Sequence, residues 1–88
     1  MKVDYTHRFK KDIQKIVNKK LKIKIESTIE NCKAADTPEQ IKNLKKLKGY
    51  DIFFRIEIGD FRIVTSIEEN LETFSRCLPR KDIYKKFP

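Results

Sequence analysis

The clearest hydrophobic pattern in the chain is a pair of apolar runs on either side of residues 59–60, Gly-Asp. A two-residue link of this kind between runs rich in isoleucine, phenylalanine and valine is a strong signal for a β-hairpin. If Ile58 pairs with Phe61, then Glu57 faces Arg62, because directly opposed residues point to the same side of a sheet. The predicted core face comprises Ile52, Phe54, Ile56, Ile58, Phe61, Ile63 and Ile67, and the outer face comprises Phe53, Arg55, Glu57, Arg62 and Val64.

The residues before the hairpin have the spacing of amphipathic helices. Thr6 can cap a helix that runs to about Asn18, and a second helix is predicted from about Lys20 to Ala34. Apolar residues recur at helical spacing in both segments, and the lysines fall largely on the outer faces. This pattern indicates a helical hairpin packed on a sheet.

The remaining segments predict short elements around that framework. Residues 2–6 alternate as a first strand, and residues 37–40, Thr-Pro-Glu-Gln, predict a short helical turn. Residues 71–78 form a further antiparallel strand with a possible bulge, Pro79 ends it, and residues 80–87 form a terminal helical turn. We therefore expect one α+β domain over residues 1–88, with a small antiparallel sheet of about four strands and two N-terminal helices on one face.

Composition narrows the class of protein. With 39% apolar and 39% charged residues, the chain suits a compact, surface-charged domain. The net charge is +8, and its excess of lysine lies in the first half, whereas most of the arginine lies in the second half. No run is long and apolar enough for a bilayer, so we expect no membrane partner and a cytoplasmic location. Cys32 and Cys77 lack metal-ligand spacing and are interpreted as buried, reduced thiols.

The candidate chemistry is basic and aromatic. His7 has no neighbouring nucleophile and suits a capping or surface role, the carboxylates are scattered, and two glycines exclude a glycine-rich phosphate loop, so no metal or other cofactor is expected. Cations that hold phosphates and flat rings that stack on bases suit RNA. A solvated polar face, with Arg62 simply paired to Glu57, stays open as the alternative. The basic and aromatic set comprises Arg55, Arg62, Lys46, Lys48, Arg80 and Tyr84.

Three segments after the two predicted helices carry a family resemblance. They are residues 46–50 (Lys-Leu-Lys-Gly-Tyr), residues 54–64 (Phe-Arg-Ile-Glu-Ile-Gly-Asp-Phe-Arg-Ile-Val) and residues 80–84 (Arg-Lys-Asp-Ile-Tyr). In this order they resemble the RelE branch of the RelE/ParE toxin superfamily. The resemblance implies a small basic toxin of a type II toxin–antitoxin pair, with an antiparallel sheet and two helices on one side. It also implies a metal-independent endoribonuclease that enters the ribosomal A site and cuts mRNA there.

The resemblance also implies roles for single residues. Cleavage without metal needs a base for the ribose 2′-hydroxyl, cations for the phosphorane and an acid for the departing oxygen. The family pattern implies that Arg55 and Arg62 contact the scissile phosphate. We expect their guanidinium groups to lie side by side, pointing away from the core and towards an open concavity shared with Tyr84. Arg80 would hold the backbone or aid proton transfer, and Tyr84 would stack on a base or orient it. The residues expected to assist substrate binding are Lys46, Lys48 and Lys81.

Three positions depart from the family pattern. Pro79 replaces a histidine that many relatives have before the arginine, Glu57 stands where ribosome-dependent cutters tend to be basic, and Thr65 replaces an aromatic residue. Two other functions therefore stay open. One is a ParE-like protein that blocks DNA gyrase without cutting, and the other is a diverged, non-catalytic module that binds antitoxin or nucleic acid.

A cognate antitoxin is the expected protein partner. The +8 charge favours an acidic partner and also steers the protein towards ribosomal RNA. A short sheet covered on one side leaves edges and apolar patches for a partner segment. We expect the antitoxin to lay a helix and an extended strand over a surface that includes Phe53, Val64 and Phe87.

Overall fold

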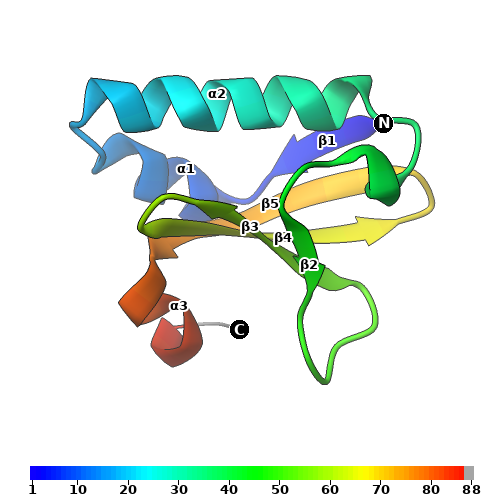
Figure 1. The fold of residues 1–88 in the computed structure, drawn as a ribbon. Helices are drawn as coiled ribbons and strands as arrows, with labels where there is room; N and C mark the ends of the chain where they lie inside the picture. The colour runs from blue at the N-terminus through cyan, green and yellow to red at the C-terminus, as the bar shows by residue number, and fades with distance from the viewer. Residues whose placement is uncertain (87–88) are drawn as a thin grey trace.

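The computed structural model describes residues 1–86 of the chain, which form a five-stranded sheet with a helical layer on each face (Figure 1). The long second helix crosses one face of the sheet, and the short last helix lies on the other face. The strands follow the order β1-β5-β4-β3-β2. The elements in chain order are β1 (Lys2–Tyr5), α1 (His7–Gln14), α2 (Lys19–Ala34), a 3-10 turn (Pro38–Gln40), β2 (Leu44–Lys46), β3 (Phe53–Ile58), β4 (Phe61–Glu68), β5 (Leu71–Pro79) and α3 (Arg80–Lys86).

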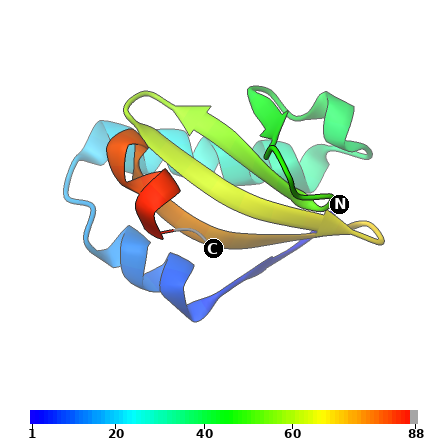
Figure 2. The same ribbon diagram turned by 90° about the horizontal axis from the view of Figure 1, so that it is seen from below.

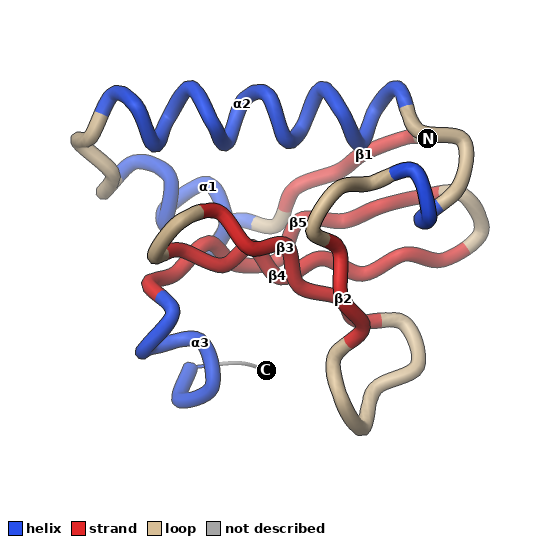
Figure 3. The backbone as a smooth tube through the Cα atoms, in the orientation of Figure 1, coloured by secondary structure: helices blue, strands red, loops and turns tan. Residues whose placement is uncertain are grey.

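The sheet differs from the prediction in two respects. It is mixed rather than antiparallel, because β1 pairs in parallel with β5, and it contains β2 as a fifth strand (Figure 3). The sequence concealed β2 because the strand spans three residues, of which two are exposed lysines. The first helix also ends at Gln14, before the predicted Asn18, whereas the second spans nearly the predicted range. The α+β class and the antiparallel pairing of β3, β4 and β5 are confirmed, whereas the predicted number of strands and the predicted antiparallel direction of β1 are wrong.

The hairpin forms in the predicted register. Ile58 pairs with Phe61 and Glu57 with Arg62, as the alternating pattern required. Gly59 has a φ of 55°, which suits the first central position of a type II′ turn and is unfavourable for residues with a Cβ. The local sequence therefore fixes which side chains share a face.

A bulge separates the two halves of the β4–β5 ladder. Val64 pairs with Arg76, whereas Thr65 pairs with Phe74, so Ser75 is the extra residue on β5. The Thr6 hydroxyl donates to the carbonyl of Ser75 at 2.8 Å and accepts from the amide of Phe9 at 3.1 Å. The predicted cap at Thr6 and the predicted bulge are both confirmed, and together they fix the point where β1 gives way to α1.

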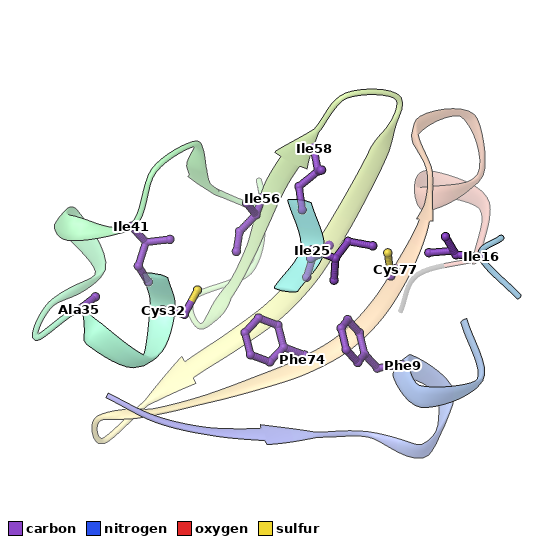
Figure 4. Packing of buried hydrophobic residues seen from close by; sticks show 11 residues of the cluster. Phe9, Ile16, Ile25, Cys32, Ala35, Ile41, Ile56, Ile58, Phe74 and Cys77 are labelled. Atoms are coloured by element: carbon purple, nitrogen blue, oxygen red, sulfur yellow. The ribbon is translucent and has the colours of Figure 1, made fainter. Parts of the chain in front are cut away.

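The main core lies between the sheet and the N-terminal helices (Figure 4). Phe9 and Phe74 pack with ring centroids 5.4 Å apart, and Ile25 of α2 is buried with them. Cys32 and Cys77 are buried and free, which confirms the interpretation as reduced thiols. Burial raises the pKa of both thiols, that of Cys77 to about 12.

A fully buried carboxyl group lies within this core. Glu72 is 0% exposed, and Oγ1 of Thr65 donates to its Oε2 at 2.9 Å. Desolvation raises the pKa of Glu72, although the hydrogen bond from Thr65 opposes the shift. Thr65, which stands where the family pattern has an aromatic residue, therefore has a structural role, because its hydroxyl group donates a hydrogen bond to the buried Glu72.

The last helix, α3, lies on the opposite face of the sheet (Figure 2), and a second, smaller core lies beneath it. Ile83 of α3 packs with Leu47, Val64 and Leu78, and the half-buried Phe53 lies against this cluster. Val64 is 0% exposed, so the prediction that it forms part of an exposed apolar patch is wrong. The third helix covers this face of the sheet, which was expected to be open. Phe87, the third residue of that predicted patch, lies outside the described residues.

Candidate functional site

The face of the sheet that carries α3 also carries three cations arranged around one carboxylate. Lys45 of β2 pairs directly with Arg55 of β3, and Glu57 of β3 pairs directly with Arg62 of β4. Side chains of directly opposed residues point to the same side, and residues two apart on β3 share a face. These four residues therefore lie on one surface, which we call the cation cluster.

The carboxylate of Glu57 is the centre of the cation cluster. Its Oε2 lies 3.7 Å from Nζ of Lys45, 3.7 Å from Nη2 of Arg55 and 4.0 Å from Nε of Arg62. The side chain of Glu57 is 34% exposed and that of Arg55 is 26% exposed. The cluster is consequently open to solvent over Arg55 and Glu57 and carries a net charge of +2.

Arg62 is more enclosed than the sequence suggested. Its side chain is 11% exposed, and its Nη1 donates to the carbonyl oxygens of Gly59 and Phe61, at 2.8 Å each. The expectation that both arginines point into an open concavity is therefore wrong for Arg62. The prediction that Arg55 and Arg62 lie on one face of the sheet is confirmed. The ion pair between Arg62 and Glu57, which the alternative of a solvated polar face required, is also present.

The start of α3 is tied to the hairpin turn. The amide of Arg80 donates to the carbonyl oxygen of Asp60 at 2.7 Å, which places the first turn of the helix at the same end of the hairpin as Arg62. Arg80 and Lys81 are both exposed there. The backbone of Tyr84 belongs to α3, but its side chain lies outside the described part of the structure.

The lysines predicted to assist substrate binding do not all lie beside Arg55. Lys46 pairs directly with Phe54, so its side chain leaves the strand on the face opposite Arg55. Lys48 is exposed in the connection between β2 and β3. Lys45, which the sequence analysis missed, takes the place next to Arg55. A strand of three residues is too short for its alternation to be read from the sequence, and only the pairing of β2 with β3 shows that Lys45 lies on the face of Arg55.

Arg76, a further arginine of the second half of the chain, forms an ion pair with a buried acidic residue. Its Nε and Nη2 bond to the carboxylate of Asp12 in α1 at 2.9 and 3.2 Å, and this hydrogen bonding raises the pKa of Arg76. Asp12 is itself buried and also accepts the amide of Cys77 at 2.9 Å. This pair joins α1 to β5 and is structural.

The cation cluster has the chemistry of an anion site. Planar guanidinium groups bind phosphate in a fixed geometry, and a lysine adds a mobile point charge. Within residues 1–86, no group of three histidine, cysteine or acidic residues is placed to hold a metal ion. In the same range, no helix is both long and apolar enough to cross a membrane.

Comparison with known proteins gives consistent results. Residues 3–84 match the family model described as "ParE toxin of type II toxin-antitoxin system, parDE". A relative named Toxin RelE3, from Methanocaldococcus jannaschii, is 36% identical over 92 residues, which span all of both chains.

Solved structures show the same fold. A chain of a RelB-RelE antitoxin–toxin complex from Methanococcus jannaschii superposes with a TM-score of 0.82 and 30% identity, covering 97% of this chain and 99% of that chain. A chain of an archaeal RelE-RelB complex from Pyrococcus horikoshii gives a TM-score of 0.74 at 17% identity, covering 93% of this chain and 97% of that chain. The family model and the full-length relative show that the chain is a RelE-like toxin and belongs to the RelE/ParE superfamily of type II toxin–antitoxin systems.

Proposed function

We propose that this toxin enters the ribosomal A site and cleaves the mRNA there without a metal ion. The observation that carries the proposal is the cation cluster, in which Arg55, Arg62 and Lys45 surround one point on the exposed side of the β2–β4 sheet. Such a cluster stabilises the extra negative charge of a phosphorane when the 2′-oxygen attacks the neighbouring phosphate. The fixed position of Arg62, held by two turn carbonyls, supports a role in positioning rather than in general attraction.

The remaining roles follow from the placement of α3. Arg80 starts the helix at the hairpin turn, where it holds the RNA backbone or aids protonation of the departing 5′-oxygen. Lys81 is exposed beside it and Lys48 is exposed in the neighbouring connection, so both add general attraction to the backbone. Tyr84 stacks on a base or orients it. Pro79 carries no proton to transfer, so the proton transfers fall to other groups of the site.

Cleavage is tested by translation in vitro followed by primer extension. The purified toxin should produce discrete breaks in mRNA that is being translated and none in the same RNA without ribosomes. A DNA gyrase supercoiling assay on the same preparation tests the second candidate function, inhibition of DNA gyrase without RNA cleavage. Two observations favour that candidate, the match to a ParE family model and the neutralising Glu57 at the centre of the cluster. Inhibited supercoiling with intact mRNA would reject ribosome-dependent cleavage in its favour.

We also propose that an acidic antitoxin binds this chain, as RelB is paired with RelE in the archaeal complexes. The buried Val64 removes part of the surface first expected to receive it. A groove of about 480 Å³ between α1, α2 and β1 supports another location. Aromatic and aliphatic side chains line it, and Lys10 and Lys22 stand at its rim with Glu26. This composition suits an amphipathic helix with acidic flanks.

The charge of the rim provides a test of this location. Reversing it in Lys10→Glu and Lys22→Glu should weaken binding of the antitoxin encoded beside this toxin by about tenfold for the pair of changes. Lys2→Glu, an exposed lysine of β1 that does not line the groove, serves as the control. Equal affinities for the rim variants and the control would place the antitoxin elsewhere.

A further inference from the structure

Glu57 is a carboxylate in a place where the proposed function requires an incoming phosphate. All three cations of the cluster approach the same oxygen, Oε2, at 3.7 to 4.0 Å. These distances are longer than the 2.7–2.9 Å of a charge-assisted hydrogen bond, so the carboxylate is surrounded by charge rather than clamped by it. Ion pairs of this kind at a partly exposed position contribute little to stability. Releasing Glu57 from the cluster therefore costs little.

The pairing of the strands explains why an anion is needed at this point. Lys45 and Arg55 are directly opposed across β2 and β3, and like charges in directly opposed positions destabilise a sheet. Glu57 lies two residues further along β3, on the same face, and contacts both cations. Its carboxylate thus offsets the repulsion between these two cations in the free protein.

We propose that Glu57 is an internal substitute for an RNA phosphate, which the substrate displaces when it binds. This inference rests on the proposed RNA-cleaving function and adds a control over affinity to it. In the free toxin, the carboxylate offsets the charge of Arg55 and lies beside Arg62, which two carbonyl groups hold in position. When RNA binds, a phosphate oxygen takes that position and Glu57 turns to solvent, where its 34% exposed side chain already has access. Glu57 consequently lowers the affinity for RNA while it neutralises part of the positive charge of the empty phosphate site.

Glu57→Gln tests this directly, because it removes the charge and keeps the shape. The probe is a fluorescent 2′-O-methyl oligouridine, which the toxin can bind and cannot cleave because it lacks a free 2′-hydroxyl. Removing one repelling charge at about 4 Å should tighten binding by about three- to tenfold near 0.1 M salt. The slope of log affinity against log salt should become more negative by about 0.7, the value for one additional phosphate contact on a single strand.

Glu68→Gln provides the matched control. Glu68 is exposed at the far end of β4, on the same face as Arg62, and six residues along a strand place it about 20 Å away. This distance exceeds the screening length at 0.1 M salt, so the same change of charge should leave affinity and slope nearly unaltered. Equal effects of the two variants would mean that only net charge matters, and would overturn the proposal.

Other outcomes separate this inference from the proposed function. Unchanged or weaker binding by Glu57→Gln would overturn the phosphate substitute even if the wild-type toxin cleaves mRNA on ribosomes. Tighter binding with a steeper salt slope would support it even if no cleavage is found. If Glu57→Gln fails to fold, the 13C resonance of the Glu57 carboxylate in the wild-type protein gives the answer. It should shift on addition of the oligouridine, and a resonance that does not move at saturation would overturn the proposal.

Discussion

Removal of the Asp12 carboxylate should strongly destabilise this fold. Its carboxylate accepts two hydrogen bonds from the Arg76 guanidinium and one from the Cys77 amide, and it is 6% exposed. Strand β1 pairs with β5 only as far as Phe74. Beyond that point Asp12 supplies the acceptor that a neighbouring strand would otherwise provide. Asp12→Ala therefore leaves both a buried amide and a guanidinium without their partner.

The magnitude follows from these contacts. An unsatisfied buried amide costs about 1–3 kcal/mol, and breaking a buried ion pair costs about 3–5 kcal/mol. The side chain of Arg76 is 16% exposed and can recover some hydration, so we take a total below the sum of these two costs, about 3 kcal/mol in the free energy of unfolding. For a domain of this size, that corresponds to a fall in Tm of about 12–24 °C. Asp12→Asn keeps an acceptor for Cys77 and should cost about half as much.

Urea unfolding followed by circular dichroism measures these changes. Asp51→Ala, which removes the carboxylate of an exposed loop residue, is the control and should stay within about 0.5 kcal/mol of wild type. If Asp12→Ala also stays within that range, or if Asp12→Asn is as damaging as Asp12→Ala, the account of this contact is wrong.

Two further predictions concern the buried titratable groups. Because burial raises the pKa of Glu72, the folded protein keeps a proton that the unfolded chain has lost, and wild-type stability should fall as pH rises above about 4.5. Glu72→Gln should therefore gain stability on wild type as the pH rises above about 4.5 in urea titrations; parallel profiles would contradict this. Cys32 and Cys77, whose thiol pKa values burial raises, should not react with a thiol-specific dye near pH 8 unless the protein is denatured. Rapid labelling of either thiol in the folded protein would refute that expectation.

The elements that were predicted correctly from the sequence are those determined by residues close together in the chain. The register of the β3–β4 hairpin follows from a two-residue turn and strict alternation, so the positions of Arg55, Glu57 and Arg62 on one face were predictable. The Thr6 cap and the start of α3 after Pro79 have similarly local signals. These elements need no knowledge of distant residues.

The errors arose where distant segments meet. The cover over Val64 comes from Ile83 of α3, and the partner of Arg76 lies 64 residues away in α1. Neither contact leaves a periodic pattern in the sequence. The strand β2 is too short for alternation to separate Lys45 from Lys46, and only its pairing with β3 assigns Lys45 to the cluster.

The central claim is that Arg55 and Arg62 form the phosphate-binding part of a ribosome-dependent nuclease. The most direct test compares wild-type toxin with Arg55→Gln and Arg62→Ala in ribosome cleavage and growth-arrest assays. Folding is monitored by circular dichroism, and Lys33→Gln, a lysine of α2 paired with Glu30, is the control. We predict discrete mRNA breaks and growth arrest with wild type and the control, and loss of both with each folded arginine variant. Intact mRNA with the wild-type toxin, or cleavage at the wild-type level by either arginine variant, would contradict the account.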